Sequence, residues 1–255
     1  MTSGIGSAMG IEDGPLDPPP RHWYLPVAEH LGEAYFRYSF TQGTEQEVDF
    51  LYDALCLTEG CRLLDVGAGP GRHAIELAAR GVQVVALDSS PKFMNLGRRL
   101  AEEAAVVGVS FFEMDAFDLP FEDEFDAAMS ICEGAFGLGL EDLRILRGMT
   151  RALKPGGHIA VTSANVYHLL AGSHSGTFDP VSALFKQIQE VIGEDGSVKS
   201  FEMWNSCYTP RELEWIANGA GLDPQFVSGV APGQFRGQRP TFVHPELLLL
   251  ARKPF

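Results

Sequence analysis

The segment Leu63-Leu64-Asp65-Val66-Gly67-Ala68-Gly69-Pro70-Gly71 decides the fold of this chain. Its apolar start is typical of a short buried strand, and the glycines follow where that strand ends. Glycine is needed where the backbone turns sharply and a ligand approaches main-chain atoms without a Cβ in the way. Residues 72–80 then form a helix pattern that Gly81 ends. The free N–H groups at the start of that helix suit a carboxylate or a phosphate.

Strand and helix patterns alternate outward from this segment. We expect strands at 82–87, 109–114, 125–132 and 158–163, a helix capped by Ser90, a helix over 143–153, and a turn at 154–157. Thr209-Pro210 begins another helix, and two late strands follow at 226–230 and 246–251. Such alternation requires right-handed crossovers. The predicted fold class is therefore α/β, with a doubly wound, mostly parallel seven-stranded sheet and helices on both faces.

The chain divides into five predicted parts around that sheet. They are a disordered tail at 1–20, a helical cap at 21–57, a ligand-binding core at 58–166, a lid or substrate insertion at 167–208, and a closing helix and hairpin at 209–255. We expect a helix near 181–192 inside the insertion. Within the cap, Thr44 and Glu47 have the spacing of a capping box.

Charge and cysteine usage limit the partners. The 255 residues include 19 Lys and Arg against 34 Asp and Glu, a net charge of −15. A field of that sign repels phosphate backbones and anionic lipid heads, so we expect neither nucleic acid nor membrane as a partner. The four cysteines form no C-x-x-C pair, and we expect no metal site. With no secretory signal or membrane segment recognised, we expect a soluble, cytoplasmic protein.

Spacing distinguishes between ligands for the glycine turn. A dinucleotide fingerprint places its third glycine at position 72, but that residue is Arg72 and the third glycine is Gly71. Asp88 ends the second strand about 20 residues after Gly67, where an acid can accept both hydroxyls of a ribose. We interpret Arg72 as a surface residue and His73 as a packing residue of the following helix.

Four motifs in this order resemble those of class I S-adenosylmethionine-dependent methyltransferases. They are residues 65–71, Asp88, Met114-Asp115-Ala116 and Pro155-Gly156-Gly157. The resemblance implies an enzyme that uses S-adenosylmethionine to methylate a small-molecule acceptor. It also implies a cofactor site made of Asp65, Gly67, Ala68, Gly69 and Gly71 at the methionine end, Asp88 with Ser89 at the ribose, Asp115 and Ala116 at the adenine, and Cys132 beside the sulfonium.

Aromatic residues of the cap are further candidates for the cofactor site. The stretch containing Tyr35, Tyr38 and Phe40 is similar to a bacterial subgroup of that family. Ring faces can shield a sulfonium cation, by about 0.5–2 kcal/mol per contact. These side chains equally fit the core stripe of a helix, and both interpretations stay open.

Two residues are candidates for catalysis. Glu133 is the carboxylate nearest the expected methyl position, where it would act as a general base or hold a substrate amine. A helix cap or a contact with the cofactor amine explains Glu133 equally well. His168 is a second candidate base in the insertion, where Trp204 and Tyr208 are expected to line a substrate pocket.

Two other functions remain as alternatives. One is a protein that binds S-adenosylmethionine without turnover, and the other is a nicotinamide-dependent oxidoreductase, which Arg72 disfavours. The chain lacks the N-P-P-Y turn of enzymes that methylate nucleic-acid amino groups. The sequence leaves open whether the acceptor atom is oxygen, nitrogen or carbon, and which oligomer forms.

Overall fold

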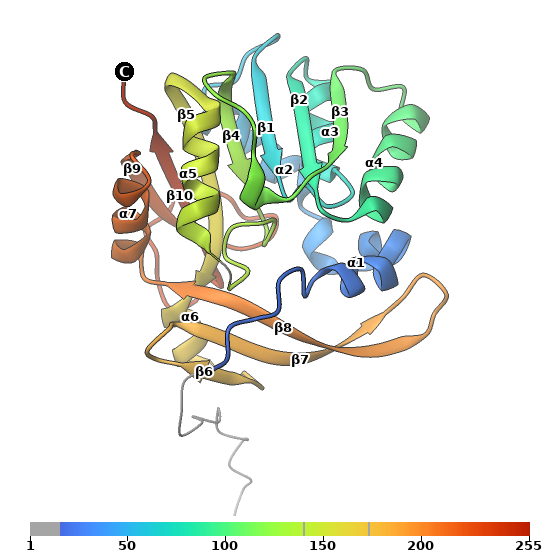
Figure 1. Ribbon diagram of the computed structural model, residues 1–255, viewed down its shortest axis with the longest axis vertical. Coiled ribbons are helices and arrows are strands. Elements are labelled where there is room, and N and C mark those ends of the chain that lie inside the picture. The colour runs from blue at the N-terminus through green and yellow to red at the C-terminus, as the bar shows by residue number, and fades with distance from the viewer. Residues whose placement is uncertain (1–15, 140, 173) are drawn as a thin grey trace, which may run out of the picture.

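A parallel sheet forms the centre of the computed structural model, which describes residues 16–139, 141–172 and 174–255. Its strands are β1 (Arg62–Val66), β2 (Gln83–Asp88), β3 (Val109–Glu113), β4 (Phe125–Ser130) and β5 (Leu153–Asn165), in the order β3-β2-β1-β4-β5 (Figure 1). The chain reverses its direction across the sheet between β1 and β4. Residues 1–15 of the predicted tail lie outside the described residues.

Two further strands close the sheet. β10 (Glu246–Arg252) lies antiparallel to β5, and β9 (Asp223–Val230) lies antiparallel to β10. This gives the order β3-β2-β1-β4-β5-β10-β9, and the end of β5 also pairs in parallel with β8 (Val198–Tyr208), so the sheet has ten strands in the described part of the chain. The predicted mostly parallel sheet and its closing hairpin are confirmed, but the predicted count of seven leaves out the three strands of the insertion.

Consecutive residues of a strand are buried on opposite faces of this sheet. Leu63 packs in one core cluster with α2 (Thr44–Ala54), α3 (Arg72–Ala79) and α4 (Pro91–Glu103). Leu64 packs in the other with α5 (Asp142–Ala152) and α7 (Pro210–Gly219). Because side chains alternate along a strand, a continuous apolar run supplies both cores. The prediction of helices on both faces is confirmed.

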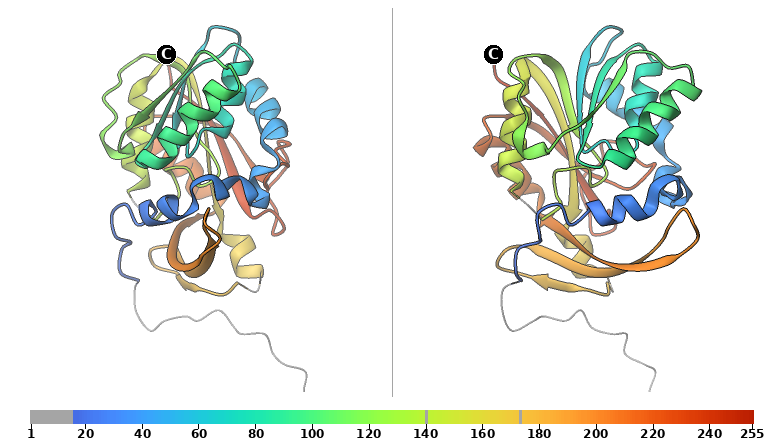
Figure 2. Two further views of the ribbon diagram at one scale, coloured as in Figure 1. Left: turned by 90° about the vertical axis from the view of Figure 1, so that its right-hand side faces the viewer. Right: turned by 45° about the vertical axis from the view of Figure 1, so that its right-hand side comes forward.

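The segment after β5 differs most from its predicted structure. It contains α6 (Val166–Ala171), β6 (Thr177–Asp179), β7 (Leu184–Ile192) and β8 (Val198–Tyr208). The predicted helix at 181–192 is wrong, because β7 pairs with β8 as a long antiparallel hairpin. This hairpin crosses the carboxyl edge of the sheet, with α1 (Leu25–Leu31) between the two (Figures 1 and 2).

The N-terminal cap is helical, as predicted. It consists of α1, two 3-10 turns at η1 (Gly32–Arg37) and η2 (Ser39–Thr41), and α2. The predicted capping box is wrong, because Gly43 is the N-cap of α2 and the Glu47 side chain turns away toward α3.

The predicted turn at 154–157 also differs, because the structure includes these residues in β5. Gly156 has a φ of 79°, and the pairing of β4 with β5 shifts its register nearby. No helix in the described part of the chain has the length and apolar character of a membrane span.

Candidate active site

The glycine turn after β1 depends on close backbone contacts. Gly67, Gly69 and Gly71 have φ values of 75°, 56° and 79°, a region that side chains disfavour. A Cβ on Gly67 would lie 2.2 Å from the carbonyl carbon of Gly134. A Cβ on Gly71, the N-cap of α3, would lie 2.4 Å from the Phe111 ring. Glycine at these positions lets β1, the turn and α3 pack closely around the carboxyl end of the strand.

Two aspartates stand beside this turn. The Asp88 carboxylate accepts hydrogen bonds from the Gly69 N–H at 2.9 Å and the Ser90 N–H at 2.8 Å, which fixes its position at the end of β2. Burial raises the pKa of Asp88 to about 6, although these two bonds lower it. Burial and the charge of Asp88 raise the pKa of Asp65 to about 7. A cationic group placed here would favour the ionised form of both carboxyls.

The chain after β4 is strained where it meets the glycine turn. Cys132 and Glu133 have φ values of 55° and 56°, and left-handed backbone at such residues costs about 1–3 kcal/mol each. The Ser130 hydroxyl accepts hydrogen bonds from the N–H groups of Ala135 and Phe136, which holds the loop. Burial raises the pKa of the Glu133 carboxyl, and the Asn205 side chain partly offsets this.

A cavity of about 440 Å³ lies between these loops, the N-terminal cap and the hairpin. Most of the predicted site residues line it, namely Tyr35, Tyr38, Phe40, Asp65, Gly67, Ala68, Gly69, Asp88, Cys132 and Glu133. Tyr35 lines the cavity and also packs against Phe40 and Phe93, with ring centroids 5.3 and 5.4 Å apart. This position is compatible with both interpretations of the cap aromatics.

Some predicted cofactor residues stand outside this lining, within the described residues. They are Gly71, Ser89, Asp115 and Ala116. The Asp115 carboxylate pairs with Arg21 at 2.6 Å and with His22 at 3.3 Å. The expected adenine contact of Asp115 and Ala116 is therefore covered by the N-terminal segment in this structure.

The predicted residues of the insertion also lie elsewhere. His168 belongs to α6 and lies outside the described cavity lining. Its ring Nδ1 is 2.8 Å from the Phe242 carbonyl oxygen. Trp204 packs on Trp23 with ring centroids 5.6 Å apart, and the Tyr208 hydroxyl donates to Asp142 at 2.7 Å. The hairpin contributes other side chains to the cavity, namely Gln187, Gln189, Val191 and Met203.

Arg72 is the most informative residue that sequence reasoning misjudged. The predicted surface position is wrong, because only 4% of its side chain is exposed and it lines the cavity. Its Nη1 donates to Glu47 at 2.5 Å and to Thr44 at 2.8 Å. Its Nε and Nη2 are buried, and neither has a partner within the described part of the chain. An unpaired buried donor is costly, so these nitrogens suit an anionic ligand.

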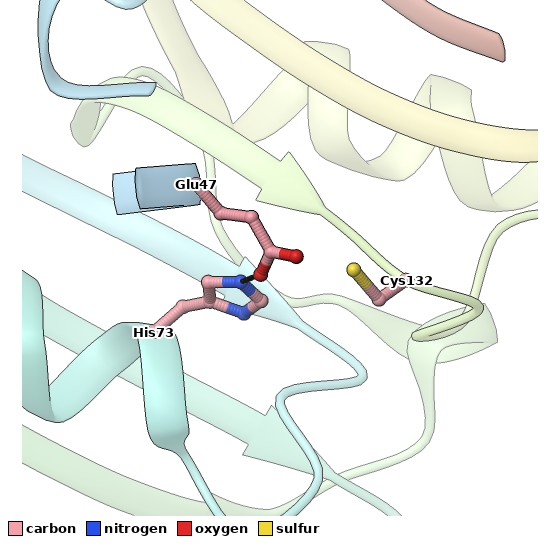
Figure 3. A group of neighbouring side chains, drawn as sticks. All are labelled: Glu47, His73 and Cys132. Carbon is pink, nitrogen blue, oxygen red and sulfur yellow. Dashed lines mark hydrogen bonds and ion pairs between the residues drawn. The ribbon is translucent and has the colours of Figure 1, made fainter. Parts of the chain in front are cut away.

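Glu47 holds that arginine and is itself bound by His73; Figure 3 shows the contact between Glu47 and His73. The Glu47 carboxylate is fully buried and accepts hydrogen bonds from Arg72, from the Gly233 N–H at 2.7 Å and from His73 Nε2 at 2.8 Å. Burial would raise the pKa of Glu47, but the bonds and charges of His73 and Arg72 lower it to about 2. Burial lowers the pKa of His73, and Arg72 adds to this. A proton on Nε2 makes the hydrogen bond from His73 to the Glu47 carboxylate.

Glu47, His73 and Cys132 lie close enough to be considered as metal ligands. However, the neighbouring Arg72 guanidinium repels a metal cation, and the Glu47 oxygens are already hydrogen-bonded. Burial also raises the pKa of the Cys132 thiol well above its usual value. We therefore assign this cluster to the support of Arg72.

Glu246 is a second missed residue of the cavity. It is the first residue of β10, and its Oε2 is buried without a partner in the described part of the chain. Burial and the charge of Glu133 raise the pKa of Glu246 to about 8. No local motif marks this residue, because it reaches the cavity only through the pairing of β10 with β5.

Comparisons with known proteins agree with this geometry. Residues 63–157 match a family described as a methyltransferase domain. A demethylmenaquinone methyltransferase of Clavibacter sepedonicus is 40% identical over 110 residues, which cover 42% of this chain and 43% of the relative. The chain thus matches less than half the length of that curated relative.

Solved structures extend the likeness of the fold to most of the chain. The CcbJ methyltransferase from Streptomyces caelestis superposes with a TM-score of 0.73 at 20% identity, covering 89% of this chain and 98% of that one. A 1,6-didemethyltoxoflavin-N1-methyltransferase from Burkholderia thailandensis, with S-adenosylhomocysteine bound, gives 0.58 at 18% identity and covers 94% of both chains.

Proposed function

We propose that this protein is a class I S-adenosylmethionine-dependent methyltransferase that transfers a methyl group from S-adenosylmethionine to a small molecule. The match of residues 63–157 to a methyltransferase domain and the shared fold of the CcbJ methyltransferase support this proposal. The cap and the hairpin enclose the cavity and so provide the space for an acceptor.

One observation carries the proposal, which is that the charges of the cavity fit the cofactor. The two unpaired nitrogens of Arg72 suit the carboxylate of its methionine part, and Asp65 suits the ammonium. Asp88 suits the ribose hydroxyls, because each of its oxygens keeps a lone pair beyond its backbone bond. Asp115 and Ala116 remain our proposal for the adenine.

The bound cofactor supplies an electrophilic methyl group on a sulfonium cation. The residues of this chain position the reactants and exclude water, which are the main requirements of an in-line displacement. Tyr35, Tyr38 and Phe40 present aromatic surface to the cavity and stabilise a nearby cation. Glu133 lies at the end of β4, where it would accept a proton from the acceptor or hold it.

The acceptor is a small molecule in this proposal. The relative from Clavibacter sepedonicus is named a demethylmenaquinone methyltransferase, and the structure from Burkholderia thailandensis is that of a 1,6-didemethyltoxoflavin methyltransferase. Both names refer to small-molecule acceptors. The net charge of −15 also disfavours a nucleic-acid acceptor.

Calorimetry tests the cofactor. We expect S-adenosylhomocysteine to bind and NAD to give no heat of binding. Asp88→Asn should weaken S-adenosylhomocysteine by about tenfold or more, because the ribose loses a charged acceptor. Asp53→Asn, at an exposed position of α2, is the matched control and should bind as the unchanged protein does. NAD binding without S-adenosylhomocysteine binding would overturn the proposal.

A second measurement separates turnover from binding alone. The protein is incubated with methyl-labelled S-adenosylmethionine and a metabolite extract, and labelled products are identified by mass spectrometry. Label in a small molecule is the expected result. Tight cofactor binding with no labelled product from any extract would favour a binding protein without turnover.

A further inference from the structure

The cavity carries two glutamates that the cofactor leaves unmatched. We propose that the methyl acceptor is an amine, held as its ammonium form between Glu133 and Glu246. This inference rests on the proposed methyl transfer and names the substrate class of the same site.

The two carboxylates come from different elements and meet at the same end of the cavity. Glu133 follows β4, Glu246 begins β10, and both line the cavity. Strand β5 connects the two, because the Cys132 N–H donates to the Thr162 hydroxyl at 2.7 Å and Glu246 pairs with Ala164, two residues further along the same strand. The charge of Glu133 raises the pKa of Glu246, in agreement with this placement.

Glu246 has an unused acceptor in this arrangement. Its Oε2 is buried without a hydrogen-bond partner in the described part of the chain, although Glu246 lines the cavity. Two like charges in a buried site repel each other, and a cation placed between them removes that repulsion. An ammonium supplies a positive charge and donors for both carboxylates, whereas a neutral hydroxyl supplies a single donor.

The charge balance of the cavity also favours an amine as the acceptor. Among the described lining residues, Arg72 is the permanent cation, and Glu47 already neutralises it. Asp65 and Asp88 are assigned to the cofactor ammonium and ribose. Glu133 and Glu246 then face one cation of the cofactor, the sulfonium, which we expect beside Cys132. A neutral phenol or carbon acceptor would therefore leave one of the two carboxylates without a cation.

The lining residues of the hairpin add no charge to the cavity. Gln187, Gln189 and Val191 alternate along β7 and face the cavity, and Met203 pairs with Gln187 from β8. These side chains are neutral, and the two amides can bind polar groups of the acceptor through donors and acceptors alike. The ammonium of the acceptor therefore belongs at the end of the cavity that carries the glutamates.

The proposed reaction balances in protons and electrons. The ammonium first gives one proton to the carboxylate pair, which frees the nitrogen lone pair. That pair forms the new bond to the methyl carbon, while the sulfur keeps the electrons of the broken carbon–sulfur bond. The product is an N-methylammonium ion, and the uncharged thioether of the cofactor remains.

The test compares two probes of nearly the same shape. Calorimetry measures benzylamine and benzyl alcohol binding to protein saturated with S-adenosylhomocysteine. We expect benzylamine to bind about tenfold or more tightly than benzyl alcohol, because a charged donor bonds carboxylates more strongly. Glu246→Gln and Glu133→Gln should each weaken benzylamine by about tenfold and leave benzyl alcohol unchanged. Glu190→Gln, on the exposed side of β7, is the matched control.

The outcomes separate this inference from the proposed function. Equal affinity for the two probes, or no benzylamine binding, with S-adenosylhomocysteine binding intact would overturn the amine and leave methyl transfer standing. A second measurement compares S-adenosylmethionine with S-adenosylhomocysteine in Glu246→Gln. An unchanged ratio of affinities is expected. A selective loss of S-adenosylmethionine would show that the glutamates serve the sulfonium instead, and would also overturn the inference.

Discussion

Arg72 shows how one residue connects folding with ligand binding. A buried ion pair contributes little net stability, because desolvation offsets the attraction of its charges. Here Glu47 uses its other hydrogen bonds to His73 and the Gly233 N–H, so the carboxylate is fixed on three sides. The guanidinium is held in one orientation, and its Nε and Nη2 make no hydrogen bond within the described part of the chain.

The first prediction at this scale concerns the carboxylate of the cofactor. Arg72→Met should weaken S-adenosylhomocysteine by about 10- to 100-fold, because a charged, buried hydrogen bond is lost. It should leave 5′-methylthioadenosine, which lacks the amino-acid part, unchanged. Calorimetry with both ligands measures this difference, and Arg80→Met at the exposed end of the same helix is the control. Equal losses for both ligands would place Arg72 outside the methionine subsite.

The residues of the site divide by how local their signal is. Asp65, Gly67, Gly69 and Asp88 were predicted because their positions along one strand–turn–helix unit determine where they lie. Arg72 was misjudged because its burial depends on Glu47, which lies 25 residues earlier in the chain. No local pattern distinguishes a buried arginine from an exposed one at the start of a helix.

At the scale of elements, the β7–β8 hairpin is a second feature that local sequence patterns did not predict. Apolar residues at 184, 188, 191 and 192 fit a helical spacing, but β7 buries Leu184 and Val191 and leaves Ile188 exposed. The sequence signal for a hairpin is the Gly193-to-Ser197 turn between two runs that can form strands. Pairing with β8 over nine residue pairs then decides in favour of the strand.

The N-terminal segment at 21–24 is the second element that shapes the site. Arg21 and His22 pair with Asp115, the Trp23 Nε1 donates to the Leu138 carbonyl at 3.1 Å, and the Tyr24 hydroxyl donates to Ser89 at 3.4 Å. The segment thus crosses the predicted adenine and ribose residues. With the cofactor in the proposed place, its entry and release require these contacts to loosen.

The prediction for this segment is kinetic. Arg21→Ala should speed both binding and release of S-adenosylhomocysteine several-fold, with a smaller change in the dissociation constant, because both directions pass the same contacts. Stopped-flow fluorescence of Trp23, which lines the cavity, measures the rates. Arg37→Ala serves as the control. Unchanged rates in Arg21→Ala would mean that the cofactor enters by another route.

At the scale of the whole molecule, the topology determines where the site lies. The strand order reverses between β1 and β4, so their connections leave on opposite sides and open a crevice at the carboxyl edge. Asp65, Cys132 and Glu133 all lie at that edge. The location of the site could therefore be predicted from the alternation of elements, whereas its enclosure by the hairpin could not.

The last prediction follows from the carboxyls collected in this crevice. Burial raises the pKa of Glu246 to about 8 and that of Asp65 to about 7, whereas in an unfolded chain they are about 4.3 and 3.9. The folded protein thus binds more protons than the unfolded chain between these values. Its free energy of unfolding therefore falls as the pH rises from 6 to 8, by an amount on the order of 4 kcal/mol.

Denaturant unfolding at pH 6, 7 and 8 measures this slope for the protein without ligand. Glu246→Gln should flatten it, because the amide does not titrate, and saturating S-adenosylmethionine should flatten it too, because its cationic groups favour ionised carboxyls. Glu190→Gln should keep the slope of the unchanged protein. A stability that rises with pH over this range would mean that these carboxyls are already ionised in the empty cavity. In that case a cationic ligand would not be needed to stabilise their charged forms.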